Sequence, residues 1–259
     1  EKEKLLEVRH LKKYFSTPAG QLHAVDDVSF DIAKGETLGV VGESGCGKST
    51  LGRAVLRLHE PTSGEVLFRG ENILAYSNKQ MKDLKKEMQL IFQDPFSSLN
   101  PRMTVSQAIA LPLLIQGVYD KKDKAALNQK VRELMNLVGL AQRFVNSYPH
   151  ELDGGRRQRI GIARALSLHP SFIVCDEPVS ALDVSIQAQI LNLMQDLQNE
   201  MGLTYMFITH DLSVVKHLAN KIMVMYLGTV GEYCDVKQLF TRPLHPYTKA
   251  LLSAIPVPD

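Results

Sequence analysis

The chain has 259 residues, of which 44% are hydrophobic and 22% are charged, and its formal net charge is +2. This length can bury a sizeable core, as one large domain or a core with a subdomain, and the near-neutral charge gives no sign of a nucleic-acid binder. No apolar run approaches the roughly 18 residues that span a bilayer, and no apolar signal segment opens the chain, so we expect a cytoplasmic protein that reaches a membrane only through a partner.

Two extended strands are predicted first. Apolar and polar residues alternate across residues 5–32, which is typical of half-buried antiparallel strands, and residues 16–20 form the expected loop between them. Tyr14 stands near the end of the first strand, where its ring could pack in the core or offer an aromatic face to a nucleotide base.

A glycine-rich loop follows a predicted buried strand at 37–41 and precedes a predicted helix at 51–58. It has the sequence GESGCGKST and fills every fixed position of the phosphate-loop pattern G-x-x-x-x-G-K-[ST] in the strand–loop–helix context that this pattern requires. The candidate phosphate-binding residues are Gly42, Glu43, Ser44, Gly45, Cys46, Gly47, Lys48, Ser49 and Thr50.

The residue types of this loop suit a polyphosphate. Gly42 and Gly47 allow backbone angles and close approaches that a Cβ would block, so that successive N–H groups can surround phosphates at the positive end of a helix. Lys48 is expected to reach the β- and γ-phosphates, and the Ser49 hydroxyl to bind Mg²⁺.

Helical patterns replace strand patterns over residues 95–155, which we interpret as an insertion in an α/β core. The elements predicted before it are a strand at 65–68, a polar helix over 72–87 and a strand at 88–93. The helices predicted within it are 104–118, interrupted at Pro112, and 123–138. The later elements are a helix opened by Gly154 and Gly155 with Asp153 as N-cap, a helix at 183–200, a hairpin at 221–234 turning at Gly228, and a helical tail at 236–254.

Two acidic residues, Asp176 and Glu177, end the buried strand predicted at 171–178. Because ligands of α/β proteins sit at the carboxyl ends of strands, we interpret these acids as a metal ligand and a base rather than as chance surface acids. His210 follows the predicted buried strand 204–209, and its place at the same sheet edge favours a functional role over a structural one.

The ordered motifs resemble those of the ATP-binding subunit of an ATP-binding cassette (ABC) transporter, from about Leu5 to the end of the chain. GESGCGKST matches its Walker A, FIVCDEP its Walker B with the following glutamate, and SALD its D-loop; Gln93 in IFQDP resembles the Q-loop and His210 in ITHDL the switch histidine. The resemblance implies an α/β fold, with a P-loop NTPase (RecA-like) core, an antiparallel β subdomain and an inserted α-helical subdomain.

That fold implies four segments of the chain. They are 1–94 (antiparallel β subdomain and first part of the ATP-binding core), 95–155 (α-helical subdomain), 156–235 (second part of the core) and 236–259 (C-terminal helical tail).

The resemblance also implies that ATP and Mg²⁺ are the cofactors. Lys48 would bind phosphate. Ser49 and Gln93 would ligate Mg²⁺, and Asp176 would hold the ion through water.

Four further roles follow from the same resemblance. Glu177 would act as the base that orients the attacking water, and His210 would contact the γ-phosphate. Asp183 would couple the two sites of a dimer, and Tyr14 matches the aromatic residue that stacks on adenine.

One segment departs from the family. Members usually have Ser-Gly-Gly-Gln where this chain has Asp153-Gly154-Gly155-Arg156. The serine normally donates a hydrogen bond to the γ-phosphate of the opposite ATP, whereas an ionised aspartate only accepts. Asp153 could turn away to cap the helix, pair with an arginine, or weaken the ATP sandwich. Our hypothesis is that Arg156 and the amides of Gly154 and Gly155 bind the phosphate while Asp153 caps.

Two stretches are similar to the oligopeptide and dipeptide importers of bacteria: FQDPFSSLNPRMTV (92–105) and RPLHPYTKALLSAIPVPD (242–259). The implied partners are a second ATP-binding subunit in a head-to-tail dimer, transmembrane permease subunits and, indirectly, an extracytoplasmic solute-binding protein, without nucleic acid. The implied location is the cytoplasmic face of the cell membrane. Members usually continue further, so the tail is expected to be truncated.

Other functions are weighed against peptide import. Similar subunits import nickel and some sugars. Soluble ABC ATPases that act on nucleic acid or ribosomes usually carry a long coiled-coil insertion or two cassettes, and exporters are often fused to membrane helices. A degenerate regulatory cassette would account for the altered residues 153–156, but the intact Glu177 and His210 argue against it.

Overall fold

The computed structural model describes residues 1–45, 47–92 and 99–255, and the chain groups into two compact units. The first unit comprises Glu1–Lys82 and Gly202–Asp259, and the second comprises Asp83–Met201. The four segments expected from the sequence are a different division of the chain, and they remain a prediction. Within the described ranges, no helix is both long enough and apolar enough to cross a membrane.

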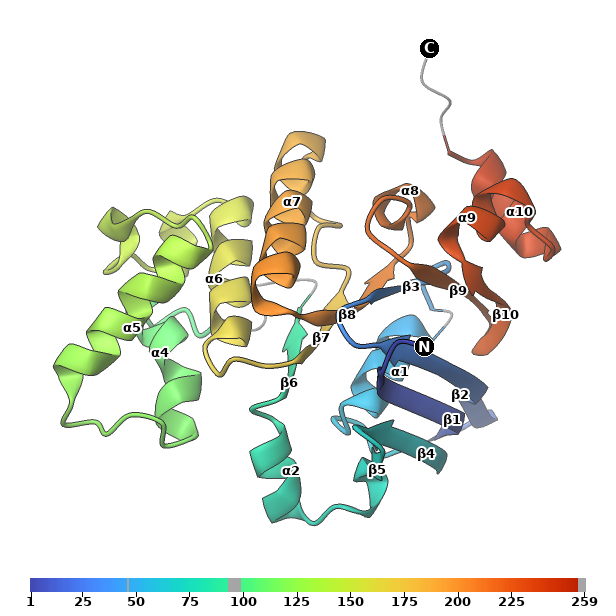
Figure 1. The fold of residues 1–259 in the computed structure, drawn as a ribbon, viewed down its shortest axis with the longest axis horizontal. Helices are drawn as coiled ribbons and strands as arrows, with labels where there is room; N and C mark the ends of the chain where they lie inside the picture. Colours follow the sequence, from blue (N-terminus) through green and yellow to red (C-terminus); the bar gives the residue numbers. More distant parts are fainter. Residues whose placement is uncertain (46, 93–98, 256–259) are drawn as a thin grey trace. The chain divides into compact units, whose positions relative to one another are not determined.

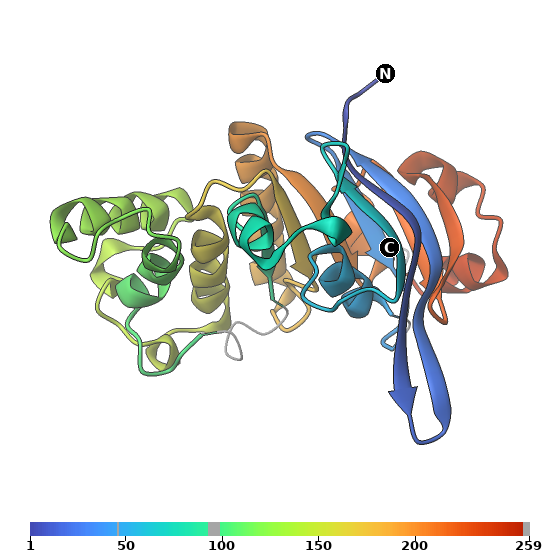
Figure 2. The same cartoon turned by 90° about the horizontal axis from the view of Figure 1, so that it is seen from below.

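An antiparallel sheet in the first unit has the strand order β2-β1-β4-β5. Its strands are β1 (Lys4–Thr17), β2 (Gly20–Ala33), β4 (Ser63–Phe68) and β5 (Glu71–Asn72). Val28, Phe30 and Ile32 of β2 are buried, as the alternating pattern predicts. The hairpin of β1 and β2 reaches well beyond β4 (Figure 2).

A second set of strands in this unit has the order β10-β9-β3-β8. Its members are β3 (Thr37–Val41), β8 (Thr204–Thr209), β9 (Lys221–Tyr226) and β10 (Thr229–Asp235). β3 is parallel to β8 and to β9, and every residue of β3 and β8 is buried. This is why both strands are continuous apolar runs in the sequence. The expected hairpin turn lies at Leu227 and Gly228, both with positive φ, as a two-residue turn of this kind requires.

Helices of the first unit contact both groups of strands (Figure 1). They are α1 (Lys48–Val55), α2 (Asn78–Leu84, which ends across the boundary), α8 (Leu212–Val215), α9 (Val236–Thr241) and α10 (Pro246–Ser253). Helix α1 contacts β1 and β2 of one sheet and β8 of the other. The predicted helical tail at 236–254 is confirmed as α9 and α10, which are separated by residues 242–245.

In the second unit, β6 (Met88–Ile91) pairs in parallel with β7 (Phe172–Asp176). Its helices are α4 (Val105–Ile115), α5 (Lys124–Leu137), α6 (Gly154–Leu166) and α7 (Val184–Met201), with short 3₁₀ turns η2 (Gln142–Phe144) and η3 (Pro149–Glu151). Helices α4, α5 and α6 pack on one another (Figure 1).

The expected interruption at Pro112 is wrong, because α4 continues through this residue. A proline inside a helix removes one N–H bond and brings its ring against the carbonyl of residue i−4, and the burial of Ile109 and Leu113 on both sides of Pro112 offsets this cost.

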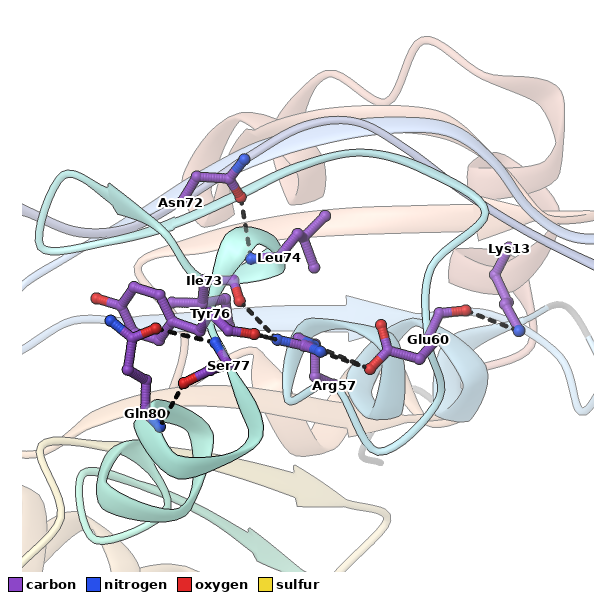
Figure 3. Close-up of polar contacts among 9 residues, drawn as sticks. All are labelled: Lys13, Arg57, Glu60, Asn72, Ile73, Leu74, Tyr76, Ser77 and Gln80. Carbon is purple, nitrogen blue, oxygen red and sulfur yellow. Dashed lines mark hydrogen bonds and ion pairs between the residues drawn. The ribbon is translucent and has the colours of Figure 1, made fainter.

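The predicted helix over 72–87 is also wrong in its first half. A 3₁₀ turn, η1 (Ile73–Ala75), follows β5, and α2 starts only at Asn78. The carbonyl groups of Ile73 and Tyr76 both accept hydrogen bonds from Nη1 of Arg57, at 3.0 and 2.8 Å (Figure 3). A helix would use those carbonyls for its own N–H groups, so a side chain that lies far away in the sequence breaks the helical pattern.

Arg57 is a structural arginine, and its removal is expected to destabilise the fold. Its side chain is 11% exposed and also binds Glu60, which is 67% exposed. Arg57→Ala would leave two carbonyls without a charged donor, and we expect a loss of about 2–4 kcal/mol in the free energy of unfolding. Glu60→Ala removes only the exposed ion pair and is expected to cost less than about 1 kcal/mol. Urea unfolding of both variants measures the difference; equal effects would contradict this role.

Candidate functional site

The phosphate loop follows β3, as predicted, but its last three residues, Lys48–Thr50, already form the first turn of α1, whose start the sequence placed at Leu51. Gly47 caps α1 with φ at 96°, and a Cβ built there would lie 2.1 Å from the carbonyl oxygen of Ala24. No other residue fits this position without moving the backbone of β2. Gly45 also has a positive φ, 81°.

Lys48 is buried, with 5% of its surface exposed. Its Nζ donates to the carbonyl oxygens of Gly42, at 2.5 Å, and Glu43, at 3.0 Å. The ammonium group is thus held inside the curve of the loop, where a phosphate could replace these carbonyls as its partner. Among the other candidates, Gly42 is buried, Gly47, Ser49 and Thr50 are half-buried, and Glu43, Ser44 and Gly45 are exposed. Cys46 lies outside the described residues.

His210 follows β8 at the same edge of the first unit. Val41, the last residue of β3, is the register partner of Thr209, the last residue of β8. The phosphate loop and His210 therefore start from neighbouring strand ends. The N–H of Asp211 donates to Oγ1 of Thr209 at 3.1 Å, and the Asp211 side chain caps α8 by accepting from the N–H of Ser213. These hydrogen bonds fix the backbone on both sides of His210, whose side chain is exposed.

The two candidate acids lie in the second unit. Asp176 is the last residue of β7 and is 4% exposed, and Glu177 is 9% exposed. Glu177 has a φ of 47°, a left-handed conformation that costs a non-glycine residue about 1–3 kcal/mol. The N–H and the hydroxyl of Ser180 both donate to the Glu177 carbonyl, at 3.3 and 3.1 Å, and so help to hold it. Gln93, the predicted Q-loop residue, lies outside the described residues.

The altered motif combines two of the alternatives raised by the sequence. Oδ1 of Asp153 accepts from the N–H of Arg156 at 2.9 Å and caps α6, while Oδ2 pairs with Nη1 of Arg156 at 2.7 Å. The Arg156 guanidinium also lies over the Phe144 ring, 4.8 Å from its centroid. Phe144 was not predicted, because no local pattern marks it. The pair stays accessible, with the Asp153 and Arg156 side chains 61% and 42% exposed.

The two glycines of this motif lie close to Leu182 of the SALD segment and to Ile186 of α7. A Cβ on Gly154 would lie 3.1 Å from Leu182, and a Cβ on Gly155 would lie 2.8 Å from Ile186 of α7. A side chain at either position would have to displace Leu182 or Ile186, so the glycines favour a close approach of the two segments. Nε2 of Gln187 donates to the carbonyls of Val179 and Leu182, at 2.9 and 3.0 Å. These bonds shape the turn that presents the exposed Asp183 just before α7.

Tyr14 is placed in β1 and stacks on His23 of β2. The ring centroids are 3.9 Å apart and the planes are inclined by 11°. Its hydroxyl donates to Oδ1 of Asp26 at 2.5 Å, and this hydrogen bond raises the pKa of Tyr14 and lowers that of Asp26. A base that stacks on Tyr14 would use the opposite face of the ring or take the place of His23, a neighbour that no local sequence pattern indicates.

The residues present fit a nucleotide. A glycine-containing loop, a buried lysine that binds two of its carbonyls and a helix N-terminus together suit a polyphosphate. The Ser49 hydroxyl in the first unit and the Asp176 carboxylate in the second are each of the hard-oxygen type that Mg²⁺ prefers, since this ion usually takes one or two carboxylates together with phosphate oxygens and water.

The sequence of this chain is similar to the sequences of known proteins. Residues 25–180 match the ABC transporter family, and residues 232–259 match the oligopeptide/dipeptide transporter C-terminal region. The chain is 59% identical over 258 residues to the oligopeptide transport ATP-binding protein OppF of Bacillus subtilis, covering 99% of this chain and 84% of that protein. It is 53% identical to AppF, an oligopeptide transport ATP-binding protein of the same organism, over 98% of this chain and 79% of that one.

The fold of this chain is similar to the folds of solved ABC cassettes. The dimeric post-hydrolysis state of the ATP-binding cassette MJ0796, bound to ADP and Pi, superposes with a TM-score of 0.80 at 28% identity, covering 89% of this chain and 98% of that one. CbiO1 of Clostridium perfringens, part of the ABC transporter complex cbiONQ, has a TM-score of 0.80 at 27% identity, covering 93% and 92%. The chain belongs to the ABC transporter family.

Proposed function

We propose that this chain is the ATP-hydrolysing motor subunit of a bacterial importer of di- or oligopeptides, peripheral to the cytoplasmic face of the membrane. The observation that carries the proposal is the presence in one chain of an ABC cassette with a buried phosphate-loop lysine, Lys48, and of the oligopeptide/dipeptide transporter C-terminal region at 232–259.

The phosphate end of ATP would be held by the loop and by Lys48. Ser49 and Gln93 would ligate Mg²⁺, and Asp176 would hold the ion through water. When bound, Mg²⁺ neutralises charge on the phosphate oxygens. The adenine would stack on Tyr14.

Glu177 would orient the attacking water and accept its proton. Its left-handed backbone supports this role, because backbone strain of this kind is concentrated at functional sites. His210, carried at the strand end beside the phosphate loop, would contact the γ-phosphate. Asp183 would couple this site to the one in the second subunit.

The partners follow from the same proposal. A second ATP-binding subunit would stack head to tail, so that residues 153–156 of each subunit complete the site of the other. A solved relative is described as dimeric, which supports this arrangement. Closing of the dimer would move the permease subunits, and a solute-binding protein outside the membrane would deliver the peptide.

In the altered motif, we propose that Arg156 takes over the phosphate contact. An isolated Asp153 about 4 Å from a phosphate charge would be repelled by roughly 4 kcal/mol at an effective dielectric constant of about 20. The 2.7 Å ion pair places a cation beside that carboxylate and supplies guanidinium donors. Arg156 would share its donors between Asp153 and the phosphate of the opposite ATP.

Arg156→Ala is therefore expected to weaken ATP-dependent dimerisation about tenfold or more, because Asp153 then faces phosphate without its cation. The matched control is the double variant Asp153→Ser with Arg156→Gln, which restores the usual residues and should dimerise within about threefold of the parent. Light scattering with ATP measures both. Parent-like dimerisation and turnover of Arg156→Ala would rule out this contact.

The proposed function is tested with the subunit assembled with its permease and solute-binding protein in vesicles. ATP hydrolysis is expected to rise when the binding protein carries a peptide, and not when nickel or DNA is supplied. Stimulation by nickel would assign the subunit to metal import, and stimulation by DNA in the absence of the permease would assign it to the soluble ABC ATPases.

A further inference from the structure

The C-terminal region of the first unit is tied to the phosphate loop by a series of hydrogen bonds. Oε1 of Glu232, in β10, accepts from the N–H groups of Leu244 and His245, at 3.1 and 2.8 Å. Glu232 is only 9% exposed, so this carboxylate anchors the segment that precedes α10.

Helix α10 begins in a defined orientation. Nδ1 of His245 accepts from the N–H of Tyr247 at 3.1 Å and caps the helix, and Pro246 occupies its first turn, where proline suits the backbone. The Tyr247 ring also packs against Tyr226, with their centroids 4.9 Å apart. The anchor, the cap and the ring contact leave Tyr247 little freedom.

The hydroxyl of Tyr247 accepts a hydrogen bond of 2.7 Å from the N–H of Glu43, which lies 204 positions earlier. The carbonyl of the same residue accepts from Nζ of Lys48 at 3.0 Å. Glu43 is thus held through its N–H by the C-terminal region and through its carbonyl by the phosphate-binding lysine.

We propose that Tyr247 is a positioning residue for nucleotide binding, and that the C-terminal region from Glu232 to Tyr247 acts as a strap that holds the phosphate loop in its binding shape. The proposal rests on the proposed function only in requiring that ATP binds at this loop. Pre-organising a loop lowers the cost of ordering it when the ligand binds, so the strap should act on the affinity for ATP rather than on the chemical step.

Tyr247→Phe removes the hydroxyl and keeps the ring. It is expected to raise the Kd for Mg–ATP about three- to tenfold, the range for one hydrogen bond, and to raise KM with kcat within about twofold, because ground-state and transition-state binding are lost together. The matched control is Tyr226→Phe in the same aromatic pair, which should leave Kd unchanged. Calorimetric titration with ATP and steady-state kinetics measure these values.

Two further readouts separate positioning from general stability. The Glu43 amide proton should exchange faster with solvent in Tyr247→Phe, while the unfolding temperature without nucleotide stays within about 2 °C of the parent, as expected for an exposed hydrogen bond. His245→Ala, which removes the cap, should weaken ATP binding in the same direction, and His245→Asn should restore it because asparagine also caps helices.

An unchanged Kd in Tyr247→Phe would overturn the proposal, and so would a fall in affinity that Tyr226→Phe reproduces or that accompanies a large loss of stability. Failure of the parent itself to bind ATP would instead refute the proposed function.

Discussion

Glu177→Gln is expected to lower ATP turnover by about 100- to 10,000-fold, the usual contribution of a general base, while ATP affinity stays within about twofold of the parent. The amide has the shape of the carboxylate but cannot accept the proton of the attacking water. Glu177 is buried, so bulk water cannot easily replace it as a base. Phosphate release at saturating Mg–ATP measures the rate.

A second expected result of the same substitution is a trapped dimer. If hydrolysis is what opens the ATP sandwich, the variant should accumulate as a dimer with ATP in light scattering, and the parent should not. Glu200→Gln is the matched control, because Glu200 is an exposed carboxylate on α7; it should turn over ATP at the parent rate. Turnover by Glu177→Gln at the parent rate would remove Glu177 from its assigned role.

Lys48→Ala has the second large expected effect, on binding rather than on chemistry. The variant loses a charged donor inside the loop, and a hydrogen bond to a charged group contributes about 1.5–3 kcal/mol, so the Kd for ATP is expected to rise about 10- to 100-fold. Lys79→Ala on the exposed side of α2 is the control and should bind ATP like the parent. Calorimetric titration with Mg–ATP measures both.

The two substitutions together separate the roles of the two units. Loss of binding in Lys48→Ala would place phosphate recognition on the first unit, and retained binding with lost turnover in Glu177→Gln would place the base on the second. Parent-like binding by Lys48→Ala would contradict the phosphate loop assignment. Loss of binding by both variants would show that Glu177 also contributes to nucleotide affinity.

The sequence alone was enough to locate the phosphate loop and the strand-end acids. These features are local: a buried strand needs a continuous apolar run, and a loop around phosphate needs glycines at set positions. The structure accordingly places Gly47 where only glycine fits and Asp176 at the last position of β7. The N-cap role of Asp153 was also readable, because capping involves only residues within one turn.

Contacts between distant residues were decided by the tertiary structure. Arg57 takes the carbonyls of Ile73 and Tyr76 and so shortens a helix that the polar pattern predicted (Figure 3). Phe144 lies under Arg156, and Tyr247 holds the amide of Glu43. None of these contacts follows from periodicity or spacing, because each depends on which side chains the packed strands and helices bring within hydrogen-bonding or van der Waals distance. Local sequence patterns therefore predict the residue types of the candidate nucleotide site. The contacts that hold these residues in place depend on the packing of segments that are far apart in the chain.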